Sequence, residues 1–121
     1  SGASLPLYGD GSQRREWMHV TDHAKGIWLA ASNGSSGEIY NLGSGLELSN
    51  LEVATKILEI LDLPLTRIEC VEDRKGHDFR YSINSSKIKK LGWSPSYRFK
   101  GPEGGLSHTV NWYKANQWFL K

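Results

Sequence analysis

Two glycine-containing loops hold the residue types of this chain that are best suited to chemistry on a ligand. The first loop is the run Pro-Leu-Tyr-Gly-Asp-Gly-Ser-Gln-Arg-Arg-Glu-Trp at 6–17, and the second is Asp-Arg-Lys-Gly-His-Asp-Phe-Arg-Tyr at 73–81. Glycine lets the backbone approach a ligand closely, and arginine offers a planar fork of donors that matches phosphate oxygens. Together the loops predict half of a binding cleft for a phosphorylated ligand.

A second interpretation of the same residues stays open. Gly9-Asp10-Gly11 is also an ordinary turn sequence. Arginines in loops are usually solvated surface charges that bind nothing. Either interpretation fits the local sequence, so the arrangement of the two loops in space decides between them.

The glycines do not complete the pattern of a dinucleotide site. Such a site needs G-x-G-x-x-G between a strand and a helix, so that amide groups and the helix N-terminus meet the pyrophosphate. The sixth position is Arg14 in the pattern that starts at Gly9, and Leu48 in the pattern that starts at Gly43. No tyrosine has a lysine four residues later, where the lysine charge would lower the pKa of the phenol. We therefore expect no cofactor site and no catalytic residue in this chain.

A metal site and a nucleophile are also poorly supported. His19 and His23 are four residues apart and would share a face on one helix. We expect a boundary between a strand and a helix to separate them, and no third ligand follows at a matching spacing. Cys70 falls in an expected strand, and no serine lies in a nucleophile elbow. We expect neither kind of site.

The composition is that of one small globular domain. The chain has 121 residues, and 15 basic against 13 acidic residues give a net charge of +2, too small for a broad nucleic-acid-binding surface. No apolar run is long enough to cross a membrane, and the lone Cys70 excludes an internal disulfide. We expect a single domain over 1–121, with 1–4 a tag or linker remnant. We also expect a cytoplasmic location, and neither a nucleic-acid nor a membrane partner.

Four helices are predicted from capping residues and apolar spacing. The clearest begins at the capping box Ser49-Asn50-Leu51-Glu52 and ends before Pro64. The others are expected at 21–32, 85–91 and 102–118, the last with Pro102 in its first turn. The apolar residues expected to face the core are Leu51, Ala54, Ile57, Leu58 and Leu61, then Ile27, Trp28, Ala30 and Ala31, and finally Leu106, Thr109, Val110, Tyr113 and Trp118.

Four extended segments alternate with these helices. They are expected at 6–11, where a turn ends the segment, and at 16–20, 38–42 and 67–71. This alternation predicts an α/β fold in the form of a small mixed α+β domain without repeats.

Several motifs occur in an order that resembles a known family. They are Leu-Pro-Leu-Tyr-Gly-Asp-Gly at 5–11, Arg-Glu-Trp at 15–17, Tyr-Asn-Leu-Gly at 40–43, the loop at 73–81, Leu-Gly-Trp at 91–93 and Thr-Val-Asn-Trp-Tyr at 109–113. The chain resembles the C-terminal, substrate-binding part of the dTDP-glucose 4,6-dehydratases, within the NAD-dependent epimerase/dehydratase superfamily. The resemblance spans nearly the whole chain.

The resemblance implies a substrate-binding role for seven residues. The nucleobase side of the pocket would be lined by Pro6, Leu7 and Tyr8. The diphosphate would be held by Arg15 and Arg74, and further polar contacts would come from Asn41 and His77. One departure is Lys75, where the family usually has proline, and it makes the second loop more flexible. The motif tryptophans Trp17, Trp93 and Trp112 are expected in the core.

The resemblance also implies parts that this sequence lacks. The family's enzymes have an N-terminal Rossmann domain that holds NAD and the catalytic residues. They remove a hydride at C4 of the sugar, eliminate water across C5 and C6, and return the hydride to C6. We expect this chain alone to bind a dTDP-sugar or a related nucleotide diphosphate weakly, without turnover, and to self-associate through apolar surface. The alternative is a non-enzymatic orphan or an interaction module, with a vestigial nucleotide-sugar pocket.

Overall fold

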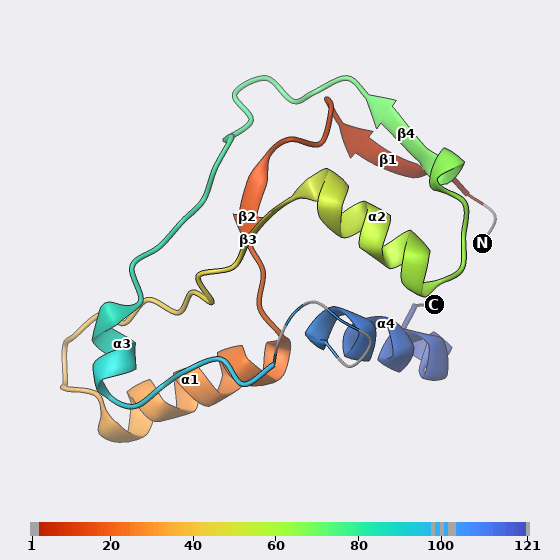
Figure 1. Ribbon diagram of the computed structural model, residues 1–121. Helices are drawn as coiled ribbons and strands as arrows, with labels where there is room; N and C mark the ends of the chain where they lie inside the picture. Colours follow the sequence, from red (N-terminus) through yellow and green to blue (C-terminus); the bar gives the residue numbers. More distant parts are fainter. Residues whose placement is uncertain (1–2, 98, 100, 102–103, 121) are drawn as a thin grey trace.

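The computed structural model describes residues 3–97, 99, 101 and 104–120. The strands are β1 (Leu5–Tyr8), β2 (Arg14–Glu16), β3 (Glu47–Ser49) and β4 (Ile68–Val71). The helices are α1 (Val20–Asn33), α2 (Asn50–Ile60), α3 (Ser86–Lys90) and α4 (Gly105–Ala115), with short 3-10 helices η1 (Leu65–Arg67) and η2 (Gln117–Leu120). This arrangement confirms the small mixed α/β fold. Figure 1 shows an open arc, with β1, β4 and α2 at one end and α1 and α3 at the other.

The first loop begins at the end of a parallel pair of strands. β1 pairs with β4 in the register Leu7 to Cys70 and Tyr8 to Val71. Parallel strands need a long crossover connection, and here α2 forms part of it and packs on β1. Because both strands run the same way, residues 9–13 after β1 and 72–80 after β4 start from the same edge.

A second set of backbone pairs brings the two loops together. β2 is antiparallel to β3, with Arg15 opposite Leu48. On its other edge, the Arg14 amide donates to the Phe79 carbonyl at 2.7 Å, and the Tyr81 amide donates to the Arg14 carbonyl at 3.1 Å. The second loop therefore lies along β2 itself.

The capping box starts α2 as the sequence predicts. The Ser49 hydroxyl accepts from the Glu52 amide at 3.1 Å, and the Glu52 carboxylate accepts from the Ser49 amide at 2.8 Å. Ala54 and Leu58 of the predicted stripe are buried, while Leu51 is exposed. α2 thereby places its apolar face between β1 and α4.

A separate cluster holds α1 to the segments around α3. Ile88 is fully buried, and the Trp93 indole donates to the Asp22 carbonyl at 3.0 Å. A Cβ atom on Gly26 would lie 2.4 Å from Leu42 Cδ2, so Leu42 and Trp93 approach α1 where it has no side chain. The buried face of α1 therefore consists of Asp22 and Gly26.

Two predicted strands differ from the structure. The strand expected at 16–20 is instead β2, which ends at Glu16, because His19 caps the start of α1. The prediction of a strand at 38–42 was wrong, since none of these residues is in a strand. The following residue, Gly43, donates to and accepts from the Ser85 hydroxyl at 2.8 and 2.9 Å. Its polar backbone groups are thus satisfied by a side chain and not by a neighbouring strand.

The last predicted helix is shorter than expected. α4 ends at Ala115, and residues 117–120 form η2. The Asn116 side chain donates to the Trp112 carbonyl at 2.9 Å, which ends the helix. Pro102, expected in the first turn, lies outside the described residues.

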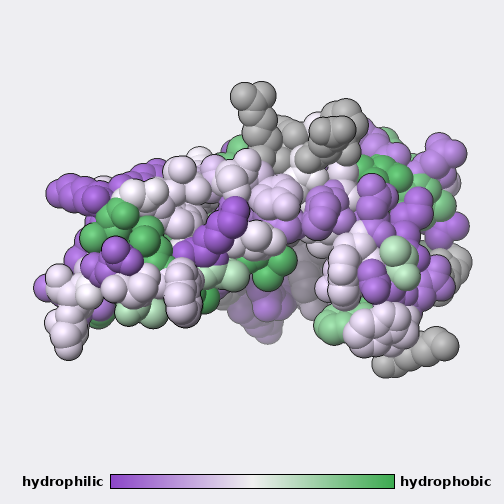
Figure 2. All heavy atoms as spheres, turned by 90° about the horizontal axis from the view of Figure 1, so that it is seen from below, coloured by the Kyte–Doolittle hydropathy of each residue, from purple (hydrophilic) through white to green (hydrophobic). Residues whose placement is uncertain are grey.

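Several residues expected in the core are exposed. Trp93 is buried as predicted, with 5% of its surface exposed. Besides Leu51, the predicted core residues that prove exposed are Ile27, Trp28 and Ala31 of α1, Trp112 and Tyr113 of α4, and Trp118 of η2. Figure 2 shows hydrophobic side chains in separate areas on one face of the molecule. Apolar surface is therefore present, and self-association through it stays a prediction.

His19 joins the start of α1 to α4. Its Nδ1 accepts from the Thr21 amide at 3.2 Å, so the proton of the neutral ring is on Nε2, 3.0 Å from His108 Nδ1. The ring stacks on Tyr97 at a centroid distance of 4.0 Å. Burial, with the nearby His108, lowers the pKa of His19 despite the opposing charge of Asp22.

Stability is expected to fall as the pH drops below about 6.5, the ordinary pKa of histidine. The unfolded chain binds a proton at His19 there, whereas the folded chain resists it, so the free energy of unfolding decreases by at most about 1.4 kcal/mol per pH unit. Urea unfolding between pH 5 and 8 measures the slope. His19→Asn keeps a capping oxygen and should reduce the slope, whereas His23→Gln, at an exposed position of α1, should retain it. A slope unchanged by His19→Asn would exclude this residue as its source.

Candidate functional site

The two loops converge around Tyr8, at the end of β1. The guanidinium carbon of Arg74 lies 5.3 Å from the centroid of the Tyr8 ring. The His77 ring meets the same tyrosine edge-on at 6.0 Å. Residues from both sequence motifs therefore form one surface, which decides against two unrelated turns.

Arg15 fastens the second loop to β2. Its guanidinium donates to the carbonyls of Asp78 at 2.7 Å and Phe79 at 3.2 Å, and to its neighbour Arg14 at 2.7 Å. The same group lies 4.3 Å from the Tyr81 ring centroid. The side chain thus brings a positive charge to the surface, but in this state its donors bind protein carbonyls.

Arg74 differs from Arg15 in the state of its donors. Within the described part of the chain, the Arg74 guanidinium has no hydrogen-bond or ion-pair partner, and it lies over the ring of Tyr8. Its residue is exposed. Arg74 is therefore the cation of this surface that is available to an incoming anion.

Asp73 and Gln13 support His77 from beneath. His77 Nδ1 lies 2.6 Å from Asp73 Oδ1. The side-chain amide of Gln13 donates through Nε2 to Asp73 Oδ2 at 2.8 Å. The hydrogen bond from His77 lowers the pKa of the Asp73 carboxyl. Neither Asp73 nor Gln13 was predicted from the sequence as a site residue, although the four-residue spacing of Asp73 and His77 was a local signal for Asp73.

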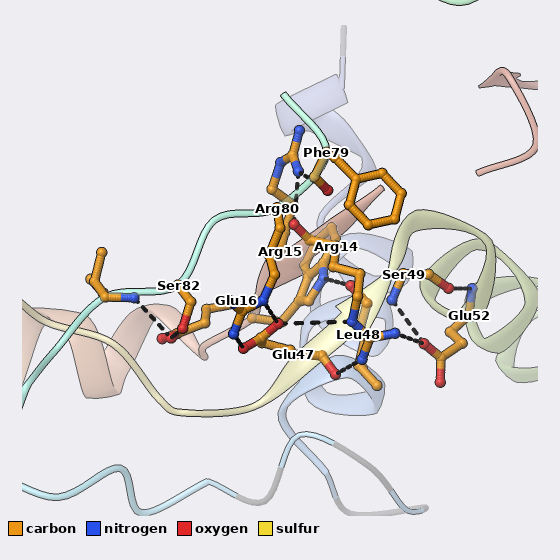
Figure 3. A network of polar contacts seen from close by, with 12 residues as sticks. Arg14, Arg15, Glu16, Glu47, Leu48, Ser49, Glu52, Phe79, Arg80 and Ser82 are labelled. Atoms are coloured by element: carbon orange, nitrogen blue, oxygen red, sulfur yellow. Dashed lines mark hydrogen bonds and ion pairs between the residues drawn. The ribbon is translucent and has the colours of Figure 1, made fainter. Parts of the chain in front are cut away.

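Glu47 on β3 pairs with two arginines, Arg14 of β2 and Arg80 of the second loop (Figure 3). Glu47 accepts two hydrogen bonds from Arg80, and the guanidinium of Arg14 lies 3.8 Å from the same carboxylate. The hydrogen bond from Arg80 holds the pKa of Glu47 below its ordinary value. Arg14 and Arg80 are therefore paired within the protein and are poorer candidates for a ligand.

Tyr81 is held in place by its own loop. Its hydroxyl donates to Asp78, and this bond raises the pKa of the phenol, while the charges of Arg15 and Arg74 act in the opposite direction. Both arginines are thus within electrostatic reach of the same ring.

The remaining predicted residues occupy less direct positions. Pro6 is exposed on β1, whereas the Leu7 side chain is buried in the core beneath the first loop. Asn41 is exposed in the segment between α1 and β3. Its neighbours Leu42 and Gly43 line a hollow of about 190 Å³ together with Arg15 and Tyr81. Asn41 is therefore close in sequence to this hollow but is not one of its lining residues.

The described histidines and acidic residues were also compared with the geometry that a metal ion needs. In the ranges that the structure describes, no group of three or more His, Cys, Asp and Glu side chains is placed to hold an ion. Nor does any helix in those ranges have the length and apolarity to cross a bilayer.

Comparison with known proteins shows which family the chain resembles. The model of the family described as GDP-mannose 4,6 dehydratase matches residues 2–102. A low-salt glycan biosynthesis protein of Haloferax volcanii is 49% identical over 113 residues, which are 93% of this chain and 36% of the relative. A dTDP-glucose 4,6-dehydratase of an Actinoplanes species is 46% identical over 117 residues, or 96% of this chain and 36% of the relative.

A solved structure extends this likeness to the fold. The crystal structure of a dTDP-glucose 4,6-dehydratase from Streptomyces venezuelae, with NAD bound, matches with a TM-score of 0.88 and 44% identity. The match covers 98% of this chain and 36% of that chain. The chain therefore spans little more than a third of the length of the relatives it matches.

The fold is one shared by epimerases and dehydratases. Within that class, the chain belongs to the GDP-mannose 4,6-dehydratase family, whose model covers most of its length. The resemblance to the dTDP-glucose 4,6-dehydratases that the motifs predicted is confirmed, and a full-length relative contains NAD as expected.

Proposed function

We propose that this chain is the part of a dTDP-sugar dehydratase that binds the nucleotide diphosphate of the substrate, and that it does not catalyse the reaction alone. The observation that carries the proposal is the exposed Arg74 guanidinium beside Tyr8, with no protein acceptor among the described residues. One guanidinium group can donate two parallel hydrogen bonds to the oxygens of a phosphate. A tyrosine ring offers a flat apolar surface on which a nucleoside can pack. The cytoplasmic location belongs to the same proposal.

The two arginines have different roles in this proposal. Arg74 meets the phosphate directly, because its donors are free. Arg15 contributes a fixed positive charge and can exchange a carbonyl partner for a phosphate oxygen, since it makes three bonds to backbone carbonyls. Pro6 and Tyr8 lie on the outward side of β1 at the nucleobase end, and Leu7 supports them from the core. His77 and Asn41 supply the further polar contacts.

Substitution of Arg74 tests the proposal against general anion attraction. We expect wild-type protein to bind dTDP with a dissociation constant on the order of 1 mM, equivalent to roughly 4 kcal/mol. Arg74→Ala should weaken binding about tenfold, since a hydrogen bond to a charged group contributes about 1.5 kcal/mol at the low end of its range. Titration of dTDP followed by amide NMR gives both affinities.

Lys75→Ala is the matched control. Lys75 is the next residue, is also exposed and carries the same charge, whereas Arg74 is the residue whose guanidinium lies over the Tyr8 ring. Its removal should change the affinity less than twofold. Equal losses in the two variants would indicate charge attraction alone and would favour the alternative function, an interaction module with a vestigial pocket.

A further inference from the structure

A series of polar contacts between four side chains connects the two loops. In order, the side chains are those of Gln13, Asp73, His77 and Arg15. Gln13 is on the first loop and donates to Asp73 on the second at 2.8 Å. Asp73 meets His77 Nδ1 at 2.6 Å, and His77 Nε2 lies 3.3 Å from an Arg15 nitrogen, back beside the first loop. The first and last side chains of this series thus belong to the first loop, and the two between them belong to the second loop.

The chemistry of the end groups determines the protonation of His77. A guanidinium has donors and no acceptor, so its contact with His77 Nε2 is a hydrogen bond only when that nitrogen has a free lone pair. A carboxylate accepts, so Nδ1 must donate to Asp73. Both contacts are hydrogen bonds at once only in the tautomer that has the proton on Nδ1 and a free lone pair on Nε2.

The His77 side chain is buried, so its tautomer depends on its protein partners and little on water. Only 6% of the His77 side chain is exposed, against 41% for Asp73, so water has little access to the ring. The Gln13 residue beneath is 4% exposed. With the ring enclosed, its tautomer depends on protein partners, and Asp73 is the acceptor for Nδ1.

We infer that Asp73 is a positioning residue of the proposed diphosphate site, acting through His77 on Arg15. By accepting the hydrogen bond from Nδ1–H, it leaves the Nε2 lone pair free to accept from the guanidinium, which lies 4.3 Å from the Tyr81 ring centroid. This inference rests on the proposed function for its ligand, but the tautomer of His77 is a property of the free protein.

Electrostatics alone predicts the opposite effect of Asp73 on an anion. Asp73 is negative and lies beside the proposed phosphate site, so its removal would strengthen phosphate binding if charge were its only influence. A loss of affinity on its removal would therefore show that it acts by positioning. Glu72 is the matched control, because it is the adjacent residue, is exposed and has the same charge, and it makes no contact with His77.

The experiment measures ¹⁵N shifts of the imidazole nitrogens in the whole chain without ligand at pH 8. Wild-type protein should show a protonated Nδ1 and an unprotonated Nε2 at His77. Asp73→Asn keeps an acceptor oxygen and should retain this tautomer, whereas Asp73→Ala should shift it toward protonated Nε2. Glu72→Ala should leave it unchanged.

The dTDP titration provides the second readout. Asp73→Ala should weaken dTDP binding about threefold to tenfold, Asp73→Asn should restore part of the loss, and Glu72→Ala should leave binding unchanged or stronger. A wild-type His77 protonated on Nε2, or tighter binding by Asp73→Ala, would overturn the inference while leaving the proposed function intact. Absence of dTDP binding by wild-type protein would instead refute the proposed function and, with it, any ligand-positioning role for Asp73.

Discussion

Replacing Asp22 by alanine is expected to lower the free energy of unfolding by about 3 kcal/mol. Asp22 is fully buried, and its carboxylate accepts from the Ser96 hydroxyl at 2.6 Å and from the amides of Ser96 and Tyr97 at 3.0 and 2.9 Å. Burial alone would raise the pKa of this carboxyl, but the hydrogen bonds outweigh it and lower the pKa. Alanine would leave the amides of Ser96 and Tyr97 without this acceptor.

Urea unfolding followed by tryptophan fluorescence measures this loss. Ser96→Ala is the control, since it removes one donor and leaves the carboxylate with its two amides; it should lower stability by about 1 kcal/mol. A loss no larger for Asp22→Ala than for Ser96→Ala would show that the carboxylate does not hold this segment to α1.

Replacing Gly11 by alanine is expected to lower the free energy of unfolding by a similar amount, about 3 kcal/mol. Gly11 has a φ of +72°, which costs an L-residue about 1 to 2 kcal/mol. In addition, its Cβ would lie 2.4 Å from Cδ2 of the buried Leu7, so the core beneath the first loop would have to move.

Gly45→Ala separates these two causes. Gly45 has nearly the same φ, +76°, but an added Cβ would meet no atom within 4 Å. Its loss of stability should therefore reflect the backbone alone, about 1 kcal/mol. Equal losses in the two variants, measured by urea unfolding, would show that contact with Leu7 contributes nothing.

Local signals were sufficient to predict some elements. The start of α2 depends on hydrogen bonds between Ser49 and Glu52, three residues apart, so the sequence motif contained the whole cause. The strand expected at 38–42 needed a partner from elsewhere in the chain. Its residues had the right composition, but Gly43 beyond it binds the Ser85 hydroxyl, 42 residues away.

Periodicity also says which residues share a helix face, but not what covers that face. Trp112 and Tyr113 of α4 were expected in the core and are exposed, because Phe119 of η2 contacts their rings but covers them only in part. On α1, the buried face is formed by Asp22 and Gly26, neither of which an apolar pattern would select. A buried carboxylate is stable there only through the distant Ser96 and Tyr97.

The candidate site shows the same division. The motif residues Tyr8, Arg74 and His77 were identified from sequence, and the structure brings them together. Gln13 and Asp73 are 60 residues apart, and their hydrogen bond exists only once β1 and β4 pair. No local pattern could predict that contact.

The most direct test of the central claim is an amide NMR map of dTDP binding to the wild-type chain, with inorganic phosphate as the parallel titration. We expect dTDP to shift the signals of residues 8–16 and 73–81 together with one affinity, and inorganic phosphate at the same concentrations to shift them only weakly. Shifts scattered over the surface, or the same shifts with both ligands, would contradict a nucleotide-diphosphate site between the two loops.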